Sequence, residues 1–390
     1  MPESAPKANP IAQELTAQIQ VGLYGTVGHL ARQLRLIDKI APRLKENGII
    51  RQLNVDRLRR RRAAGFAATH TSTEAFGGLL FAVGVLKHEL TTEDSTLSHA
   101  GQDSRVTVGD MTHLEADRRL AWKQYDLMYD VLQATFESEN GLPDYLILGV
   151  PLLFGREIYA LGFDDDVLRA EIEKLKNRAE QFWESNRPRC FPFDPKGPRV
   201  ATVHPGRPSQ ILRELMQAKP GHAVSPDRLG SELTVLLEKN NKALLSANIN
   251  RVMLGLLAPG FRTAAWSSAD SMDSRAFPRS LITEGMLSFC YQAGLRGGIT
   301  QVETLGGPDR WTPEAVDDLA ASLMALTVFD HRSAEPLPLW YARESLAPIR
   351  KRFQGKNWLD VYKGMVKKAM RGEQVEAAWL RGWDQEGKAD

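Results

Sequence analysis

The stretch of apolar residues between Pro143 and Pro151 is the most distinct hydrophobic pattern in the chain. It has apolar side chains at nearly every position, so it lacks the polar alternation of a strand with one face in water. It is also too short for a helix that buries one stripe. We therefore predict a buried central strand at 145–153.

The residues before this strand predict more β-structure. Residues 63–90 have the pattern of a β-hairpin whose turn lies within Thr73–Gly78, and a short third strand is predicted around Arg105–Val108. A helix of about 25 residues from His113 should follow. The order of hairpin, strand, helix and strand is the opening order of a ribonuclease-H-like mixed sheet flanked by helices, the α/β fold that we predict, and many other α/β folds begin in the same way.

Residues 164–185 carry apolar side chains at helical spacing, which predicts an amphipathic helix. Asp164, Asp165 and Asp166 stand at its start, where acids cap free amides, so we assign them to capping rather than to a metal. Further elements are expected in this order: a strand at 200–204, a helix at 208–217, a helical insertion at about 219–260, paired strands at 286–291 and 299–303, a helix opened by Thr312, and a basic helical region at the C-terminus.

The chain begins with a predicted helical arm. Asn9-Pro10 is typical of a helix start, and Ile11, Leu15, Ile19 and Leu23 follow at four-residue spacing. This stripe packs either on its own domain or on a second subunit, and the sequence leaves both open. We divide the chain into an arm with a basic cluster at 1–62, a ribonuclease-H-like domain at 63–355 and a helical tail at 356–390.

Composition narrows the class of protein. The chain has 390 residues, 43% hydrophobic and 25% charged, and no apolar run long enough to span a membrane, so we expect a cytoplasmic protein. Two cysteines are too few for a disulfide framework or a four-cysteine zinc site. No phosphate-binding glycine loop and no serine nucleophile elbow occur, so any ATP-driven step must come from a partner and no organic cofactor is expected.

A basic cluster is the first candidate for nucleic-acid contact, although a net charge of +2 neither requires nor excludes such a partner. Forked guanidinium groups bind phosphate, but a run of charges is also typical of a solvated helix face. The clustered residues are Arg57, Arg59, Arg60, Arg61 and Arg62. Arg207, in the turn His204–Pro208, is a further candidate for phosphate contact.

With these elements in order, the chain resembles the NurA family, DNA-end-processing nucleases that work with the hexameric HerA translocase. The resemblance spans roughly 60–350 and rests on four stretches. They are Phe66-Ala67-Ala68-Thr69 with Gly77-Gly78, then Leu148-Gly149-Val150-Pro151-Leu152, then Phe289-Cys290-Tyr291 with Val302-Glu303, and finally Pro336-Leu337-Pro338-Leu339 followed by Ala342-Arg343-Glu344 and Ile349. The resemblance implies a homodimer docked on a HerA-like hexameric ATPase, with DNA as a further partner.

The chain departs from the family at the positions that matter for metal binding. Where the family has an Asp-Gly-Ser-like sequence, an Asp-Gly-Pro-Leu sequence and a histidine, this chain has Ala67, Gly149 and Arg343. Cleavage by two metal ions needs anionic oxygen ligands, which alanine and glycine do not supply. The resemblance therefore implies a metal site that has decayed, and we expect Arg343 to repel cations while attracting a phosphate backbone.

Three functions follow. The leading hypothesis is a DNA-binding subunit of a HerA-type complex in DNA end processing, repair or phage defence, with nuclease activity lost or weak. An alternative is an active nuclease that uses Mn²⁺ or Mg²⁺ with relocated ligands, and a third is an assembly subunit that touches no DNA. The candidate relocated ligands are Glu74, Glu115, Asp117 and Glu303, each of which also suits an ordinary position at a helix start or on a solvent-facing strand.

Overall fold

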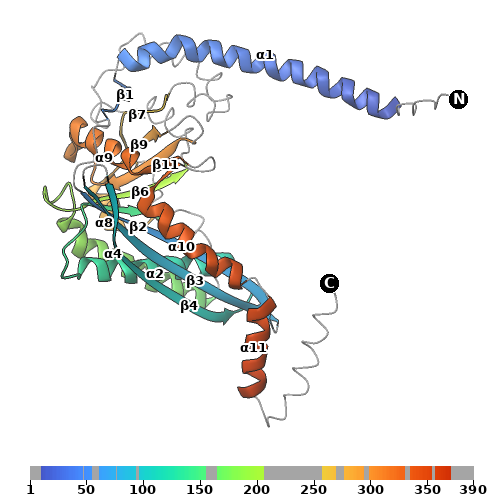
Figure 1. Cartoon of the computed structure of the whole chain (residues 1–390), viewed down its shortest axis with the longest axis vertical. Helices are drawn as coiled ribbons and strands as arrows, with labels where there is room; N and C mark the ends of the chain where they lie inside the picture. The colour runs from blue at the N-terminus through green and yellow to red at the C-terminus, as the bar shows by residue number, and fades with distance from the viewer. Residues whose placement is uncertain are drawn as a thin grey trace.

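The structure is a computed structural model, and the part of the chain that it describes forms an α/β protein around one large sheet (Figure 1). The described residues are 10–46, 48–54, 61–75, 77–93, 96–154, 165–205, 257–268, 276–293, 298–329, 334–353 and 356–369. The predicted helix at 208–217, most of the predicted insertion at 219–260, and Arg57, Arg59, Arg60 and Arg207 lie outside these residues.

The helices are α1 (Pro10–Glu46), α2 (Ala116–Phe136), α4 (Asp166–Asn186), α8 (Arg279–Glu284), α9 (Pro313–Ala325), α10 (Leu337–Phe353) and α11 (Lys356–Ala369). The strands are β1 (Ile50–Gln52), β2 (Arg61–Ala75), β3 (Gly78–Glu93), β4 (Thr96–Met111), β5 (Tyr145–Leu148), β6 (Arg199–Pro205), β7 (Phe261–Thr263), β8 (Trp266–Ser267), β9 (Met286–Gln292), β10 (Thr300–Leu305), β11 (Thr327–Phe329) and β12 (Ala334–Pro336).

Within the described ranges, one 10-stranded mixed sheet has the order β1-β7-β9-β10-β6-β5-β2-β3-β4, and β8 pairs with β9. The central strand β5 is parallel to both of its neighbours, β2 and β6, whereas the other pairs are antiparallel. A parallel strand between two partners is buried on both sides, and all of β5 is buried, as its apolar run predicted.

Helices cover both faces of this sheet. On one face, Ala67, Ile147 and Val302 pack with apolar residues of α9 and α10. On the other face, Phe66 and Leu148 pack with apolar residues of α2 and α4. Adjacent residues of β2 and β5 thus point to opposite layers, as the pleat of a strand requires.

Capping explains where two helices begin. The side chain of Asp165 accepts hydrogen bonds from the amides of Val167 and Leu168 at 2.8 and 3.0 Å, which confirms capping for this acid. Thr312 accepts from the amide of Ala315 at 3.2 Å and opens α9. Both starts were predicted because cap residues act locally.

Several predicted boundaries were wrong. The third strand is not a short one around Arg105–Val108, because pairing with β3 extends β4 over the whole of Thr96–Met111. The central strand ends at Leu148, not at Leu153, and α2 begins at Ala116 rather than His113. The stretch Pro336–Leu339 contains the end of β12 and the first turn of α10. Strands β1, β7, β8, β11 and β12 were not predicted, because such short segments become strands only through their neighbours.

The first helix, α1, runs away from the sheet along the top of the view (Figure 1). Its described apolar side chains include several that are largely exposed, such as Ile19 and Tyr24. The strand after it, β1, pairs with β7 and so joins the main sheet. No described helix is long and apolar enough to cross a membrane.

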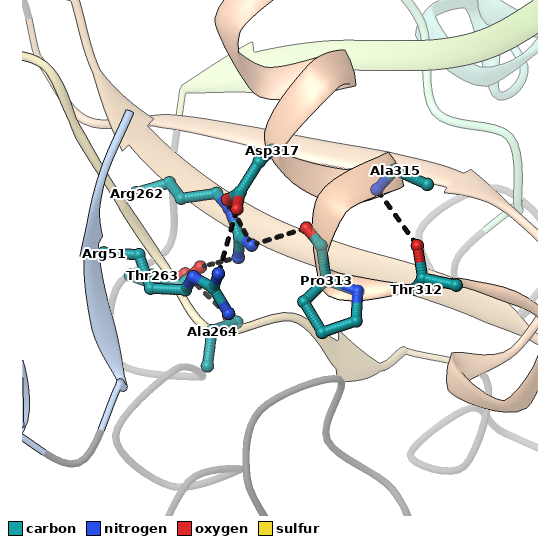
Figure 2. Close-up of polar contacts among 8 residues, drawn as sticks. All are labelled: Arg51, Arg262, Thr263, Ala264, Thr312, Pro313, Ala315 and Asp317. Atoms are coloured by element: carbon teal, nitrogen blue, oxygen red, sulfur yellow. Dashed lines mark hydrogen bonds and ion pairs between the residues drawn. The ribbon is translucent and has the colours of Figure 1, made fainter. Parts of the chain in front are cut away.

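A buried arginine joins this end of the sheet to α9 (Figure 2). Arg262 on β7 donates from Nε to Asp317 Oδ1 at 2.6 Å and from its terminal nitrogens to the carbonyls of Thr263 and Pro313. Arg51 on β1 contacts the second oxygen of Asp317 at 3.0 Å. One carboxylate therefore connects two strands and a helix.

Candidate functional site

Residues 67 and 149 lie side by side at the end of a parallel strand pair. Phe66 is opposite Leu148 in the register of β2 and β5, and the amide of Gly149 donates to the carbonyl of Phe66 at 2.9 Å. The next residue on β2 is Ala67. The two positions at which the family resemblance implies carboxylates are thus neighbours in space.

The start of α10 lies directly on β2. A Cβ on Gly65 would stand 2.2 Å from the backbone nitrogen of Leu339 and 2.2 Å from the carbonyl carbon of Pro338. Only glycine permits so close an approach of two backbones. Leu339 and Ala342 are fully buried in the layer that also contains Ala67. This packing sets the position of every later residue of α10 above the sheet.

The side chain of Arg343, the third position at which the chain departs from the family, lies next to Gly149. A Cβ on Gly149 would stand 3.6 Å from Nη2 of Arg343 and 2.9 Å from Cδ1 of Leu339. The other terminal nitrogen of Arg343, Nη1, donates to Oε1 of Glu335 on β12. The Arg343 side chain is 49% exposed and that of Glu335 10%. We call Ala67, Gly149, Arg343 and Glu335 the guanidinium site.

The guanidinium site does not fit a divalent metal ion. Ala67 and Gly149 offer no oxygen ligand, and the one carboxylate, Glu335, is paired with a permanent cation. In the described parts of the chain, no group of three or more His, Cys, Asp or Glu residues is placed to hold a metal. What the site offers instead is a half-exposed guanidinium that can donate to an anion.

Glu303 lies on the opposite face of the sheet. Phe66, Leu148, Thr202, Glu303 and Ser288 follow one another across the strands as paired residues, so their side chains share one face. Phe66 and Leu148 face α2 and α4. The sheet therefore separates Glu303 from the guanidinium site, and Oε1 of Glu303 lies 3.9 Å from Nε2 of His204.

The other candidate carboxylates are not brought together either. Glu74 is exposed beside the hairpin turn. Glu115 is the residue before α2, in the left-handed region at φ 52°, and accepts from Arg118 at 2.9 Å. Asp117 is exposed in the first turn of α2. These acids occupy a hairpin end and a helix start, where acidic side chains are common.

Arg61 and Arg62 are the two members of the arginine cluster among the described residues, and their guanidinium groups make different contacts. Arg62 donates to Glu89 at 2.8 and 2.5 Å and to the carbonyl of Asn140 at 2.9 Å. Arg61 lies over the ring of Tyr145, with its guanidinium carbon 5.9 Å from the ring centre. The Arg62 guanidinium is thus engaged within the fold, whereas phosphate contact by the cluster as a whole stays a prediction.

Sequence reasoning missed an aromatic group beside α10. The ring of His88 on β3 stacks on Tyr341 at 5.1 Å, and its Nε2 lies 3.4 Å from Nδ1 of His99 on β4. His88 is opposite Gly65, so this group lies next to the start of α10. No local signal could have revealed it, because its members come from three separate elements.

The two cysteines are unsuited to nucleophilic chemistry. Burial raises the pKa of Cys190 to about 12 and that of Cys290 well above its ordinary value, with the Glu303 charge adding to the second shift. A thiol with a raised pKa stays protonated near neutral pH, and the thiolate is the nucleophile. Neither side chain is an activated thiolate.

Comparisons with solved structures identify the fold. The NurA nuclease from Sulfolobus solfataricus superposes with a TM-score of 0.54 at 12% sequence identity, covering 94% of this chain and 99% of that chain. Two further matches are a crystal structure of NurA (TM-score 0.45, 9% identity, 96% and 100% covered) and one of NurA with manganese (TM-score 0.44, 9% identity, 91% and 98% covered).

No family model and no curated protein matches the sequence. The likeness is therefore one of tertiary structure, and it confirms the resemblance inferred from the four stretches together with the expected ribonuclease-H-like mixed sheet. This chain therefore has a fold similar to that of the NurA nuclease from Sulfolobus solfataricus.

Proposed function

We propose that this chain is a NurA-like DNA-binding subunit of a complex with a HerA-like hexameric ATPase, acting in DNA end processing, repair or phage defence, with cleavage lost or weak. The fold supports a nuclease-related role. The observation that carries the proposal is the guanidinium of Arg343 beside Gly149, the neighbour of Ala67, where the family resemblance implies metal ligands.

A carboxylate site and a guanidinium site bind ligands of opposite charge. A metal-dependent nuclease collects carboxylates so that a cation can activate water and stabilise the leaving oxygen. A guanidinium repels that cation but binds a phosphate directly through its forked N–H donors. With one terminal nitrogen on Glu335 and roughly half of its side chain exposed, Arg343 keeps donors for a DNA phosphate.

The active-nuclease alternative receives less support from the geometry. It requires that relocated carboxylates converge, yet Glu303 faces α2 and α4 whereas Glu74 and Glu115 lie at ends of different elements. The assembly-subunit alternative differs in one measurable property, since such a subunit binds the ATPase without binding DNA.

DNA binding by fluorescence anisotropy, repeated over a series of salt concentrations, tests the proposal. Arg343→Ala should weaken binding of labelled linear DNA several-fold and reduce the slope of log K against log salt by about one. Arg169→Ala is the matched control, because Arg169 is also an exposed arginine paired with an acid, Asp166, at 3.1 Å. Equal affinities for wild type and Arg343→Ala would contradict the proposal.

Cleavage and partner assays separate the alternatives. The chain is incubated with labelled single- and double-stranded DNA and Mn²⁺ or Mg²⁺, alone and with a HerA-like ATPase. We expect DNA and ATPase binding with little or no cleavage. Strong cleavage that EDTA and Glu303→Ala abolish would establish the active-nuclease alternative, and ATPase binding without DNA binding would establish the assembly subunit.

A further inference from the structure

His88 and His99 lie on neighbouring strands and direct one ring nitrogen each toward the other. Nε2 of His88 on β3 is 3.4 Å from Nδ1 of His99 on β4, and the two ring centres are 4.8 Å apart. Two nitrogens bound to one tetrahedral zinc ion at about 2.0–2.1 Å lie about 3.3–3.4 Å from each other. The two imidazoles therefore have the separation that a shared metal ion requires.

A bulge in β4 places His99 on the same face of the sheet as His88. The register of β3 and β4 shifts at Leu90, which is opposite His99, so Ala100 has no partner on β3. An unshifted register would place His99 opposite Thr91, whose side chain points to the other face. Bulges re-aim side chains in this way and are frequent beside functional sites.

The surroundings of the two histidines suit a metal ion that arrives from water. His99 is exposed and His88 is half-buried, so the facing nitrogens lie near the surface. The ring of Tyr341 on α10 stacks on His88, with ring centres 5.1 Å and ring planes 26° apart, which restricts the orientation of that imidazole. Burial and the charge on His99 lower the pKa of His88, so its nitrogen lone pair is available near neutral pH.

We propose that His88 and His99 form a binding site for a divalent transition-metal ion such as Zn²⁺, which joins β4 to β3. Imidazole nitrogen suits Zn²⁺, Cu²⁺ and Ni²⁺, whereas Mg²⁺ and Mn²⁺ prefer oxygen ligands. Two protein ligands leave the other positions of the ion to water or to an anion. The site differs in ligand chemistry from the carboxylate site that the family resemblance implies.

The affinity of this site for Zn²⁺ should be moderate. When Nε2 of His88 binds the ion, the proton of this ring resides on Nδ1, which is buried and has no hydrogen-bond partner among the described residues. Ligating histidines almost always donate this second N–H to an acceptor, and loss of such a partner weakens metal binding by about 10–100-fold. We therefore expect a chelator to remove the ion readily.

Isothermal titration of the EDTA-treated and dialysed full chain with Zn²⁺ tests the site. His99→Gln should lower the Zn²⁺ affinity about tenfold or more, because one of two ligands is lost. His113→Gln, which changes an exposed loop histidine, is the matched control and should keep the wild-type affinity. Excess Mg²⁺ should leave the titration unchanged. Equal Zn²⁺ affinities of wild type and His99→Gln would overturn the proposal, and so would a wild-type chain that binds no Zn²⁺.

Electron paramagnetic resonance with one equivalent of Cu²⁺ identifies the ligands directly. The wild-type spectrum should show two nitrogen ligands, and the His99→Gln spectrum should show one. Identical spectra of the two chains would place the ion elsewhere and refute the assignment. Neither assay contains DNA, so the result is independent of the proposed function.

Discussion

Nη2 of Arg343 lies 3.6 Å from the point where a Cβ of residue 149 would stand. A carboxylate introduced at position 149 would therefore form an ion pair with the guanidinium of Arg343 rather than bind a metal ion. The relationship depends on Leu339, four residues earlier on the same face of α10, which packs on the same glycine. The identities of Gly149 and Arg343 are thus physically coupled.

Restoring the family residues should create a metal site. We expect the variant Ala67→Asp/Gly149→Asp/Arg343→His to gain Mn²⁺ binding, because two neighbouring carboxylates and an imidazole replace two apolar positions and a cation. Isothermal titration with Mn²⁺, and the rise of the melting temperature on adding Mn²⁺, measure this gain. Gly149→Asp alone should bind no Mn²⁺, because Arg343 pairs with the new carboxylate. A folded triple variant without Mn²⁺ affinity would contradict the assignment.

Because α10 lies so close to β2, we predict that adding one methyl group at Gly65 strongly destabilises the fold. Gly65→Ala should lower the free energy of unfolding by about 3 kcal/mol or more, because the Cβ would overlap the backbone at Pro338 and Leu339. Urea denaturation measures the change. Gly364→Ala in α11 is the control, since nothing lies within 4 Å of its added Cβ, and it should cost no stability.

The network in Figure 2 predicts different costs for two adjacent acids. Asp317→Asn leaves the fully buried Arg262 charge without its counter-ion and should cost about 3–5 kcal/mol. Asp318→Asn removes only the pair with Arg199 at 3.2 Å, in which the acid is 44% exposed, and should cost at most about 1 kcal/mol. Denaturation of both variants checks this, and equal costs would refute a structural role for the buried network.

The aromatic group beside α10 predicts a pH dependence. Burial, and then the charge on His99, lower the pKa of His88 below its ordinary value of 6.5. The unfolded chain therefore binds the proton at higher pH than the folded chain, so the free energy of unfolding falls as the pH drops below 6.5 and stops falling below the folded pKa. Among the described residues, the titratable rings that pack on His88 are those of His99 and Tyr341.

Urea denaturation above and below pH 6.5 measures this dependence. His88→Gln should flatten the acid side of the profile, whereas His113→Gln, which changes an exposed loop histidine, should not. An unchanged profile in His88→Gln would mean that the proton is taken up elsewhere.

The sequence by itself determined the elements whose signals are local. Asp165 and Thr312 cap helices through their own side chains and the next few amides, so four or five residues suffice to predict each start. The hairpin of β2 and β3 and the buried strand β5 were likewise predictable from apolar patterns and turn residues. The family resemblance further singled out Ala67, Gly149 and Arg343.

Only the tertiary structure decided what these residues face. The parallel pairing of β2 with β5 places residue 149 beside residue 67, and the packing of α10 on Gly65 brings Arg343 to residue 149. The same sheet places Glu303 on its other face, although the sequence made it a candidate ligand. Side chains alternate along a strand, so a site depends on register between strands that are distant in sequence, and no short pattern encodes that register.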